Sequence, residues 1–300
     1  MAAARKKGVA GIVGLGIMGG AIARNLVSAG WQVIGHDVDP TRCSELGKAG
    51  IEIAADVEEI CARAPVILTS LPHPEALQAT VEVLSISRGP KRIVADLGTF
   101  SLEDKGWAAQ VLHEAGHVLL DCPISGTGAQ AKTRDLVIYA SGDTASIAAV
   151  KPMFLDFARE AHDLGTFGKG TKMKFVANLL VAIHNVAAAE AFALGIKAGL
   201  DPEMILALVK SGAGNSRVFE LRGPMMAKGD YRDATMKISV WQKDMAIIGE
   251  FAKDLECQTP LFDATAPIYE AAMAQGLGAQ DTAAVCAVLE KMAGIKRKHS

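Results

Sequence analysis

Three glycines near the start of the chain have the spacing of a phosphate-binding turn. Gly14, Gly16 and Gly19 follow an apolar run, residues 9–13, and lead into a segment with helical periodicity. In such a turn the first glycine allows a tight bend, the second lets the backbone approach a pyrophosphate, and the third allows close helix packing. The phosphates lie at the helix N-terminus, where N–H groups favour negative charge. The spacing predicts a dinucleotide site made of the whole turn: Gly14, Leu15, Gly16, Ile17, Met18 and Gly19.

A carboxylate follows the next apolar run, at a distance that suits the ribose of a dinucleotide. Residues 31–36 read as a strand and end at Asp37, 23 residues beyond Gly14. Asp37 can accept hydrogen bonds from the ribose 2′- and 3′-hydroxyls, and its charge would repel a 2′-phosphate. Residues 38–40 offer no positive charge, although Arg42 is close in sequence. We therefore expect NAD as the cofactor and NADP as the less favoured alternative.

A lysine and an asparagine stand one helical turn apart in a mostly apolar helical segment. Lys174 and Asn178 are four residues apart and share one face of the helix, whereas His184 points elsewhere. Alcohol oxidation by hydride transfer requires a group that takes the hydroxyl proton, and a lysine in a cleft can do this because desolvation lowers an ammonium pKa. The asparagine can orient the lysine or the hydroxyl. The alternative is a solvated helix N-terminus, and Lys172 is expected at the surface in either case.

No other pattern in the chain suggests a catalytic or metal site. The seven histidines show no metal-ligand pairing, and neither G-x-S-x-G nor H-E-x-x-H occurs, so no metal is expected. The five cysteines are odd in number and lack C-x-x-C spacing, which indicates reduced thiols rather than disulfides or a zinc site. We expect Cys122 to be a packing residue beside the site and not a nucleophile.

The elements that would position these residues fall into two halves. Up to about residue 166, short apolar runs alternate with helical patterns, which predicts an α/β fold with a mostly parallel, doubly wound sheet. The runs lie near residues 9–13, 32–36, 66–70, 92–95, 117–120, 136–140 and 161–164. From residue 170 onward the patterns are helical, beginning with one long helix over residues 171–198. We expect a Rossmann NAD-binding domain at residues 1–166 and an all-α substrate and dimerisation domain at residues 167–300, joined by that helix.

Doubly wound sheets bind their ligands at the carboxyl ends of the strands. Three of the expected ends are polar and rich in turn residues, over residues 71–74, 96–99 and 121–128. We therefore expect Leu71, Pro72 and Thr99 to face the cofactor, with the nicotinamide near Thr99.

Length and composition exclude several classes of protein. A chain of 300 residues, 50% hydrophobic and 21% charged, is large enough for about two folded domains. Its net charge of −2 gives no indication of nucleic-acid binding or of an anionic membrane. The most membrane-like stretch, residues 179–196, contains His184, Asn185 and Glu190, which favours a buried helix over a bilayer span. Residues 1–7 leave no room for a signal or transit peptide before the first strand. We expect a soluble cytoplasmic protein.

Four segments together resemble the β-hydroxyacid dehydrogenases, a 6-phosphogluconate dehydrogenase-like family that includes 3-hydroxyisobutyrate dehydrogenase and tartronate semialdehyde reductase. Residues 14–19 match the cofactor signature G-x-G-x-M-G, and residues 121–127 resemble the substrate loop D-A-P-V-S-G-G. Residues 168–178 resemble the catalytic motif G-x-G-x-x-x-K-x-x-N-N, and residues 243–244 match a later K-D pair. The resemblance covers essentially the whole chain.

This resemblance implies roles for residues of the site. It makes Lys174 the catalytic lysine, which takes the proton of the substrate hydroxyl, with Asn178 as its partner. Lys243 reaches into the cleft, where it touches both substrate and cofactor. The implied substrate contacts are Ser125, Gly126, Thr127, Phe219 and Lys243.

The chain also departs from the family motifs. Thr127 replaces the second glycine of the substrate loop, Ala177 replaces the first asparagine of the catalytic motif, and Gly98 replaces a serine in a D-x-S-T motif. These changes leave the lysine and the second asparagine in place, but they argue against 3-hydroxyisobutyrate itself as the substrate. Residues 212–220 resemble the L-threonate dehydrogenase branch more than the other branches.

The implied activity is NAD-dependent oxidation of a small hydroxycarboxylate to a semialdehyde or keto acid, or the reverse reduction. Imine reductases have a similar architecture, but they generally lack the lysine that stands here at position 174. A non-catalytic cofactor-binding relative is a further alternative, and such relatives are also expected to lose that lysine.

The long helix leaves little polar surface along its length. Residues 179–183 and 187–189 are almost entirely apolar, so the helix must be covered on most sides. The cover can come from the chain's own C-terminal helices or from the same surface of a second subunit, and two-fold contacts are the commonest solution. Members of the family pair through their helical domains. We expect a homodimer, or a tetramer built from dimers, with the interface after about residue 170.

Overall fold

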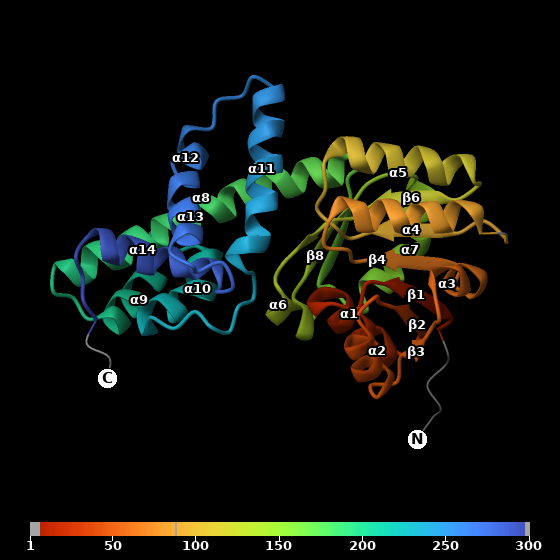
Figure 1. Ribbon diagram of the computed structural model, residues 1–300, viewed down its shortest axis with the longest axis horizontal. Coiled ribbons are helices and arrows are strands. Elements are labelled where there is room, and N and C mark those ends of the chain that lie inside the picture. Colours follow the sequence, from red (N-terminus) through yellow and green to blue (C-terminus); the bar gives the residue numbers. More distant parts are fainter. Residues whose placement is uncertain (1–6, 88, 298–300) are drawn as a thin grey trace. The chain divides into compact units, whose positions relative to one another are not determined.

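The structure, a computed structural model, describes residues 7–87 and 89–297 (Figure 1). It divides into two compact units, Met1–Lys174 and Phe175–Ser300, and the long helix α8 (Lys169–Lys197) belongs to both. We expected a boundary at residue 166. The first unit extends to Lys174, and the first turn of α8 is hydrogen-bonded to the sheet of that unit. The expectation that no leader precedes the first strand rests on residues 1–7, of which residues 1–6 lie outside the described part.

Six parallel strands form the main sheet of the first unit, in the order β3-β2-β1-β4-β5-β6. The central strand β1 pairs with both β2 and β4, so the winding of the chain reverses between β1 and β4. A ligand of such a sheet binds at the carboxyl ends of the strands beside this reversal. A second sheet joins β7 antiparallel to β8 and β8 parallel to β9. The strands are β1 (Val9–Val13), β2 (Gln32–His36), β3 (Glu52–Ile53), β4 (Val66–Thr69), β5 (Ile93–Asp96), β6 (Val118–Asp121), β7 (Ile124–Ser125), β8 (Val137–Ala140) and β9 (Glu160–Asp163).

Helices cover both faces of the main sheet. One face packs its buried residues against α1, α2, α6 and α7, and the other against α3, α4 and α5. The alternation of β1 illustrates the division, because Ile12 lies in the first cluster and Val13 in the second. Figure 1 shows α4 and α5 side by side over the sheet. The helices of this unit are α1 (Ile17–Ser28), α2 (Pro40–Gly47), α3 (Val57–Arg63), α4 (Pro74–Ile86), α5 (Leu102–Glu114), α6 (Gly128–Lys132) and α7 (Thr144–Phe154).

The expected fold class is confirmed. Each of the seven apolar runs forms a strand within one residue or two of its expected position, and five of these strands lie parallel in the main sheet. The two-residue strands β3 and β7 were not expected. A two-residue pairing leaves no periodic pattern in the sequence, and these strands exist because β2 and β8 offer them a neighbour.

The second unit is helical within its described residues. Asp201 caps the start of α9 through the Met204 N–H, at 3.0 Å, and Pro202 is its first residue, as the sequence predicts. Besides most of α8, the helices are α9 (Pro202–Lys210), α10 (Arg217–Lys228), α11 (Ile238–Asp254), α12 (Pro260–Asp263), α13 (Ala266–Ala274), the 3₁₀ helix η1 (Thr282–Ala284) and α14 (Val285–Met292).

The helix α8 is the core helix of the second unit. It is long and apolar enough to cross a bilayer by length and composition. However, Asn185 on this helix is fully buried and donates hydrogen bonds to the Tyr269 hydroxyl and to the Thr282 carbonyl, each at 2.9 Å. A polar residue with partners on two other segments belongs to a packed helical core, in agreement with the sequence-based expectation.

Candidate functional site

The glycine turn has the backbone form that a pyrophosphate site requires. Gly14 has a φ of +90°, and a Cβ there would lie 2.3 Å from the Ser70 carbonyl oxygen, so only glycine fits. A Cβ on Gly19 would lie 1.9 Å from the Gly14 carbonyl oxygen, which explains the close contact between α1 and the turn. Gly16 precedes α1 and offers no side-chain cap, so the first N–H groups of the helix stay available for an anion.

Asp37 stands at the end of β2, beside the glycine turn. Its carboxylate accepts hydrogen bonds from the Leu15 N–H at 2.7 Å and from the Asp39 N–H at 2.9 Å. The Arg42 guanidinium lies 3.7 Å from Asp37 and close to Gly16. The turn, the uncapped helix and this carboxylate fit the phosphates and the adenosine ribose of a dinucleotide. The structure thus places Arg42, whose role the sequence left open, next to the carboxylate that is predicted to bind the ribose.

The ends of β4 and β5 carry the other residues expected near the cofactor. Leu71 is half-buried and Pro72 is exposed after β4, and Thr99 is half-buried after β5. Between Thr99 and β5 lies Gly98, where a Cβ would lie 2.3 Å from the ring of Phe100. The ring of Phe100 is fully buried, so it occupies the space that a serine at position 98 would need.

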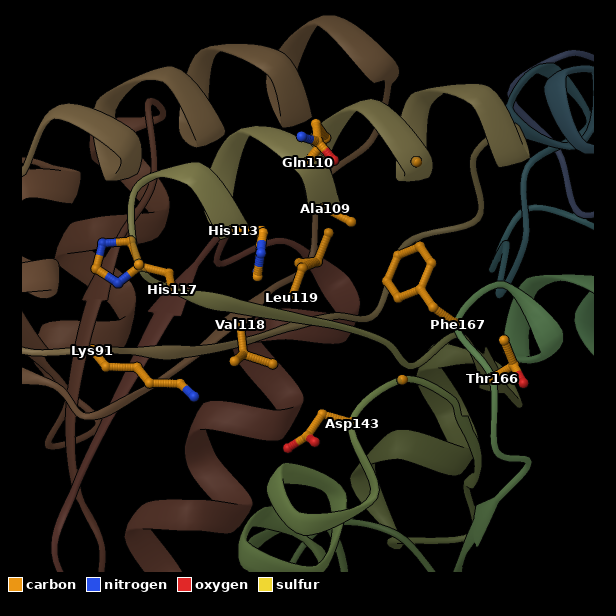
Figure 2. Close-up of a pocket in the computed structure, with 13 residues that line it drawn as sticks. Lys91, Ala109, Gln110, His113, His117, Val118, Leu119, Asp143, Thr166 and Phe167 are labelled. Carbon is orange, nitrogen blue, oxygen red and sulfur yellow. The ribbon is translucent and has the colours of Figure 1, made fainter.

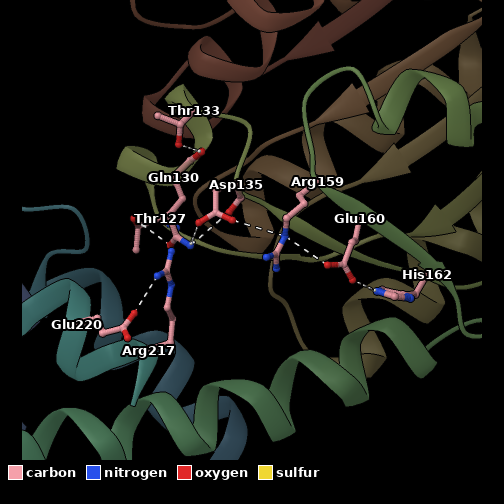
Figure 3. A network of polar contacts seen from close by, with 9 residues as sticks. All are labelled: Thr127, Gln130, Thr133, Asp135, Arg159, Glu160, His162, Arg217 and Glu220. Carbon is pink, nitrogen blue, oxygen red and sulfur yellow. Dashed lines mark hydrogen bonds and ion pairs between the residues drawn. The ribbon is translucent and has the colours of Figure 1, made fainter. Parts of the chain in front are cut away.

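The substrate loop after β6 is partly closed by its own hydrogen bonds. Ser125, Gly126 and Thr127 are all half-buried. The Thr127 N–H donates to Oε1 of Gln130 at 3.0 Å, and Gln130 in turn donates to the Asp135 side chain at 3.2 Å (Figure 3). The backbone N–H of Thr127, one of the implied substrate contacts, is therefore already engaged, and no pattern in the sequence indicates this bond.

Cys122 is a packing residue, as expected. Its side chain is fully buried, and burial together with the charge of Asp121 raises the pKa of the thiol well above its ordinary value. A thiol that stays protonated is a poor nucleophile. All five cysteines are free.

Lys174 and Asn178 lie on one face of α8 and are both buried, at 9% and 4% exposure. The alternative of a solvated pair is therefore wrong, whereas Lys172 is exposed, as expected. The Asn178 side-chain amide donates to Asp244 on α11 at 2.9 Å, and the same carboxylate lies 3.5 Å from Nζ of Lys243. Asp244 thus joins two of the predicted site residues, Asn178 and Lys243, within the second unit.

Phe219 is packed into the second unit. Its ring is 2% exposed and stacks on Phe192 of α8, with centroids 5.5 Å apart and an interplanar angle of 12°. This is the packing of a core residue in the second unit. The expected contact of Phe219 with the substrate stays a prediction.

A separate pocket of about 810 Å³ lies along β6 in the first unit. Figure 2 shows Gln110 and His113 of α5, Leu119 of β6 and the loop residues Asp143 and Phe167 around it. None of the predicted site residues lines this pocket.

Comparison with known proteins identifies the family. The model of the NAD binding domain of 6-phosphogluconate dehydrogenase matches residues 9–168. The model described as NAD-binding of NADP-dependent 3-hydroxyisobutyrate dehydrogenase matches residues 168–289. The chain belongs to the β-hydroxyacid dehydrogenase family. It is an oxidoreductase that uses a nicotinamide cofactor on hydroxy acids.

Individual relatives match along their whole length. The L-threonate dehydrogenase of Cupriavidus necator is 29% identical over 92% of this chain and 94% of its own. The crystal structure of 3-hydroxyisobutyrate dehydrogenase from Salmonella typhimurium matches with a TM-score of 0.86 and 29% identity, over 93% and 99% of the two chains. An imine reductase from Pseudomonas sp. matches with a TM-score of 0.60 and 19% identity, over 92% and 97%, a likeness of fold alone.

Proposed function

We propose that this dehydrogenase acts on a small hydroxycarboxylate with Lys174 as its general acid and base. The observation that carries the proposal is the arrangement on α8. Lys174 is buried one helical turn before Asn178, and Asp244 fixes the amide of Asn178. A buried ammonium beside an oriented amide is suited to exchange a proton with a substrate hydroxyl.

In the oxidising direction, Lys174 accepts the hydroxyl proton as the carbonyl forms, and in the reducing direction it returns that proton. The NH₂ group of Asn178 donates a hydrogen bond to the substrate oxygen, or the amide oxygen of Asn178 accepts one from the Lys174 ammonium. The bond to Asp244 keeps the amide from turning away. The bound nicotinamide supplies the acceptor or donor of hydride. The turn of Gly14 to Gly19 and Asp37 hold that cofactor, together with Leu71, Pro72, Thr99 and Lys243.

The substrate carboxylate is assigned to Ser125, Gly126 and Lys243. Ser125 offers a hydroxyl, Gly126 a backbone N–H and Lys243 a positive charge. Thr127 contributes once its bonds to Gln130 are exchanged, or it contributes through its methyl group to the shape of the pocket. Its β-branched side chain, in place of glycine, favours a substrate other than 3-hydroxyisobutyrate.

Lys174 is tested against a matched lysine on the same helix. Lys174→Ala should lower kcat by at least about 100-fold, the usual size of a general acid–base contribution. Lys172→Ala, which changes an exposed lysine two residues away, should keep wild-type kcat. Equal activity of the two variants would remove Lys174 from the mechanism.

For the substrate we propose a sugar-acid-like hydroxycarboxylate such as L-threonate. Residues 212–220 support this, as does the 29% identity to the L-threonate dehydrogenase over nearly the whole chain. A panel of L-threonate, 3-hydroxyisobutyrate and 2-(hydroxymethyl)glutarate, assayed with NAD and with NADP, ranks the candidates by kcat/KM. A preference for 3-hydroxyisobutyrate would contradict the proposal.

We also propose that the protein is a cytoplasmic homodimer, or a tetramer of dimers. Five free cysteines support a reducing compartment. An exposed apolar stripe on α8 supports self-association, since its members recur at intervals of three, four and seven residues. The stripe consists of Val176, Leu180, Ala187, Ala191 and Leu194.

A further inference from the structure

A buried group of charges lies at the carboxyl edge of the main sheet. Lys105 of α5 is fully buried, and its Nζ lies 2.7 Å from Asp96 at the end of β5 and 2.8 Å from Asp121 at the end of β6. Thr69, at the end of β4, donates to Asp96 at 2.6 Å. Three neighbouring strands thus end in Thr69, Asp96 and Asp121, whose backbones are in register. Buried ion pairs are a poor source of stability, so their presence needs another explanation.

The Asp121 carboxylate is also hydrogen-bonded to the start of α8. Its oxygens accept the Thr171 N–H at 2.8 Å and the Thr171 hydroxyl at 2.7 Å. Ser141 donates to the same carboxylate at 3.0 Å and accepts the Gly170 N–H at 2.9 Å. Two of the free N–H groups at the start of α8 are thus bound by side chains of the sheet. Asp121 therefore caps α8 from a distance of 50 residues in sequence.

The charges of the group are balanced only with α8 in place. The single ammonium of Lys105 faces two carboxylates, so it neutralises their negative charge only in part. The positive end of the α8 dipole lies at one of them, Asp121. Burial disfavours the charged form of Asp121, but Lys105 and the bonds from Thr171 outweigh it and hold the pKa of that carboxyl below its ordinary value. Asp121 therefore stays an acceptor for the helix.

Lys174 follows Thr171 by three residues and Gly170 by four, so it stands above them on the same side of the helix. A rise of about 1.5 Å per residue puts its Cα only ~4.5 Å further along the axis than that of Thr171. The first turn also lies close against the strands, because a Cβ on Gly170 would lie 2.2 Å from the Tyr139 carbonyl oxygen. The bonds to Asp121 thus fix the rotation of the turn that carries Lys174.

We propose that Asp121, with Lys105 as its counter-ion and Thr171 as its ligand on α8, is a positioning residue that sets where Lys174 presents its ammonium. This inference rests on the proposed role of Lys174 as general acid and base. In this view the buried charges position Lys174 for the reaction, and their role is not to stabilise the fold.

The test removes one hydroxyl and leaves the shape of the side chain. Thr171→Val should lower kcat about tenfold or more, because a misplacement of about 1 Å costs up to ~100-fold in rate. The KM and the dissociation constant of NADH, measured by fluorescence titration, should change less than about twofold. Thr171→Ser, which keeps the hydroxyl, should restore kcat.

A matched control separates positioning from stability. Thr265 is a buried threonine of the second unit whose hydroxyl donates to the Phe262 carbonyl at 2.7 Å. Thr265→Val should lower the melting temperature while kcat stays at the wild-type value. If Thr265→Val and Thr171→Val lower kcat alike, or if Thr171→Val leaves kcat unchanged, the positioning role is refuted.

A double variant separates this inference from the proposed function. With Lys174→Ala already present, Thr171→Val should change the residual rate by less than about twofold, because the two residues act as one unit. A further tenfold loss would show that Thr171 acts independently of Lys174 and would overturn the proposal. Wild-type activity of Lys174→Ala alone would instead refute the proposed function.

Discussion

The side-chain amide of Asn178 donates a hydrogen bond to the carboxylate of Asp244 at 2.9 Å, and both residues are buried. The bond joins α8 to α11 four residues after Lys174. A buried amide can turn about its side-chain bonds unless a partner fixes it, and the carboxylate is an acceptor that holds the NH₂ group on one side. The same carboxylate lies 3.5 Å from Nζ of Lys243. One acidic residue therefore orients an amide and a cation that we assign to the same reaction.

Loss of Asp244 should damage catalysis more than stability. Asp244→Ala should lower kcat/KM by about 10- to 100-fold, since a hydrogen bond to a charged group contributes ~1.5–3 kcal/mol. Steady-state kinetics measure this. The control is Asp254→Ala, an exposed aspartate at the end of the same helix, which should keep the wild-type kcat/KM. Similar values for both variants would mean that the Asn178–Asp244 bond has no part in the reaction.

Asp37 should determine the choice between NAD and NADP. Asp37→Ser removes the charge that opposes a 2′-phosphate, so the dissociation constant of NADPH should fall while that of NADH rises about tenfold. Arg42, which lies 3.7 Å from Asp37 and 3.4 Å from Asp39, then has only the Asp39 carboxylate as its ion partner and can turn toward the phosphate. Fluorescence titration with both reduced cofactors measures the change. Glu45→Gln, at an exposed position on α2, should leave the preference unaltered. An NADPH-preferring wild type would contradict this assignment.

Acid should destabilise the second unit through Asp281. Its carboxylate is fully buried and accepts N–H groups of Thr235, Met236 and Ala283, and Arg222 lies 3.4 Å away. Burial would raise the pKa of Asp281, but Arg222 and these hydrogen bonds outweigh it and lower the pKa below its ordinary value of 3.8. The folded pKa is the lower one, so this stabilisation is present above about pH 4 and is lost as the pH falls through the folded pKa.

Asp281→Asn tests this origin of acid sensitivity. The variant should lose about 3–5 kcal/mol at neutral pH, since it leaves the buried charge of Arg222 unpaired. Its stability should then depend less steeply on pH than that of the wild type. Urea denaturation between neutral pH and pH ~3 gives both curves, and parallel curves would assign the acid loss to other carboxylates, such as Asp121.

Thiol labelling should distinguish the exposed cysteine from the buried one beside the site. Iodoacetamide should label Cys257, which is exposed, and leave Cys122 unlabelled, because burial raises the pKa of the Cys122 thiol. Activity should persist after Cys257 is modified, as it should in Cys257→Ser. Mass spectrometry of peptides locates the label. Rapid labelling of Cys122 in the native enzyme would contradict its burial.

The sequence predicts the long strands and the glycine turn well, because both depend on local patterns. Four or five apolar residues in a row, or glycines at fixed spacing, are read directly from the chain. The buried charge group is different. Lys105 follows Glu103 and Asp104 and looks like a solvated helix residue. Its burial results from two strand ends, Asp96 and Asp121, that the sheet brings beneath it.

The substrate side of the site shows the same limit. The resemblance to the family implies that Thr127 contacts the substrate, but the bond from its N–H to Gln130 depends on the local path of the loop. It also implies a contact of Phe219 with the substrate, but not the stacking of its ring on Phe192. A motif identifies which residues occur at a position, and the packing around them decides which of their atoms are available.

The exposed stripe on α8 should be the contact between two copies of the chain. Leu180 and Leu194 are 47% and 74% exposed, although the opposite side of the helix is buried. Leu180→Glu combined with Leu194→Glu puts charges into that contact, and since both positions are exposed the fold should tolerate them. Light scattering at micromolar concentration should give at least twice 31.4 kDa for the wild type and 31.4 kDa for the variant. Lys253→Glu, at an exposed position on α11, should keep the wild-type mass, and circular dichroism should show equal helix content in all three proteins. A wild type of 31.4 kDa would refute self-association, and an unchanged mass in the double variant would place the interface on another surface.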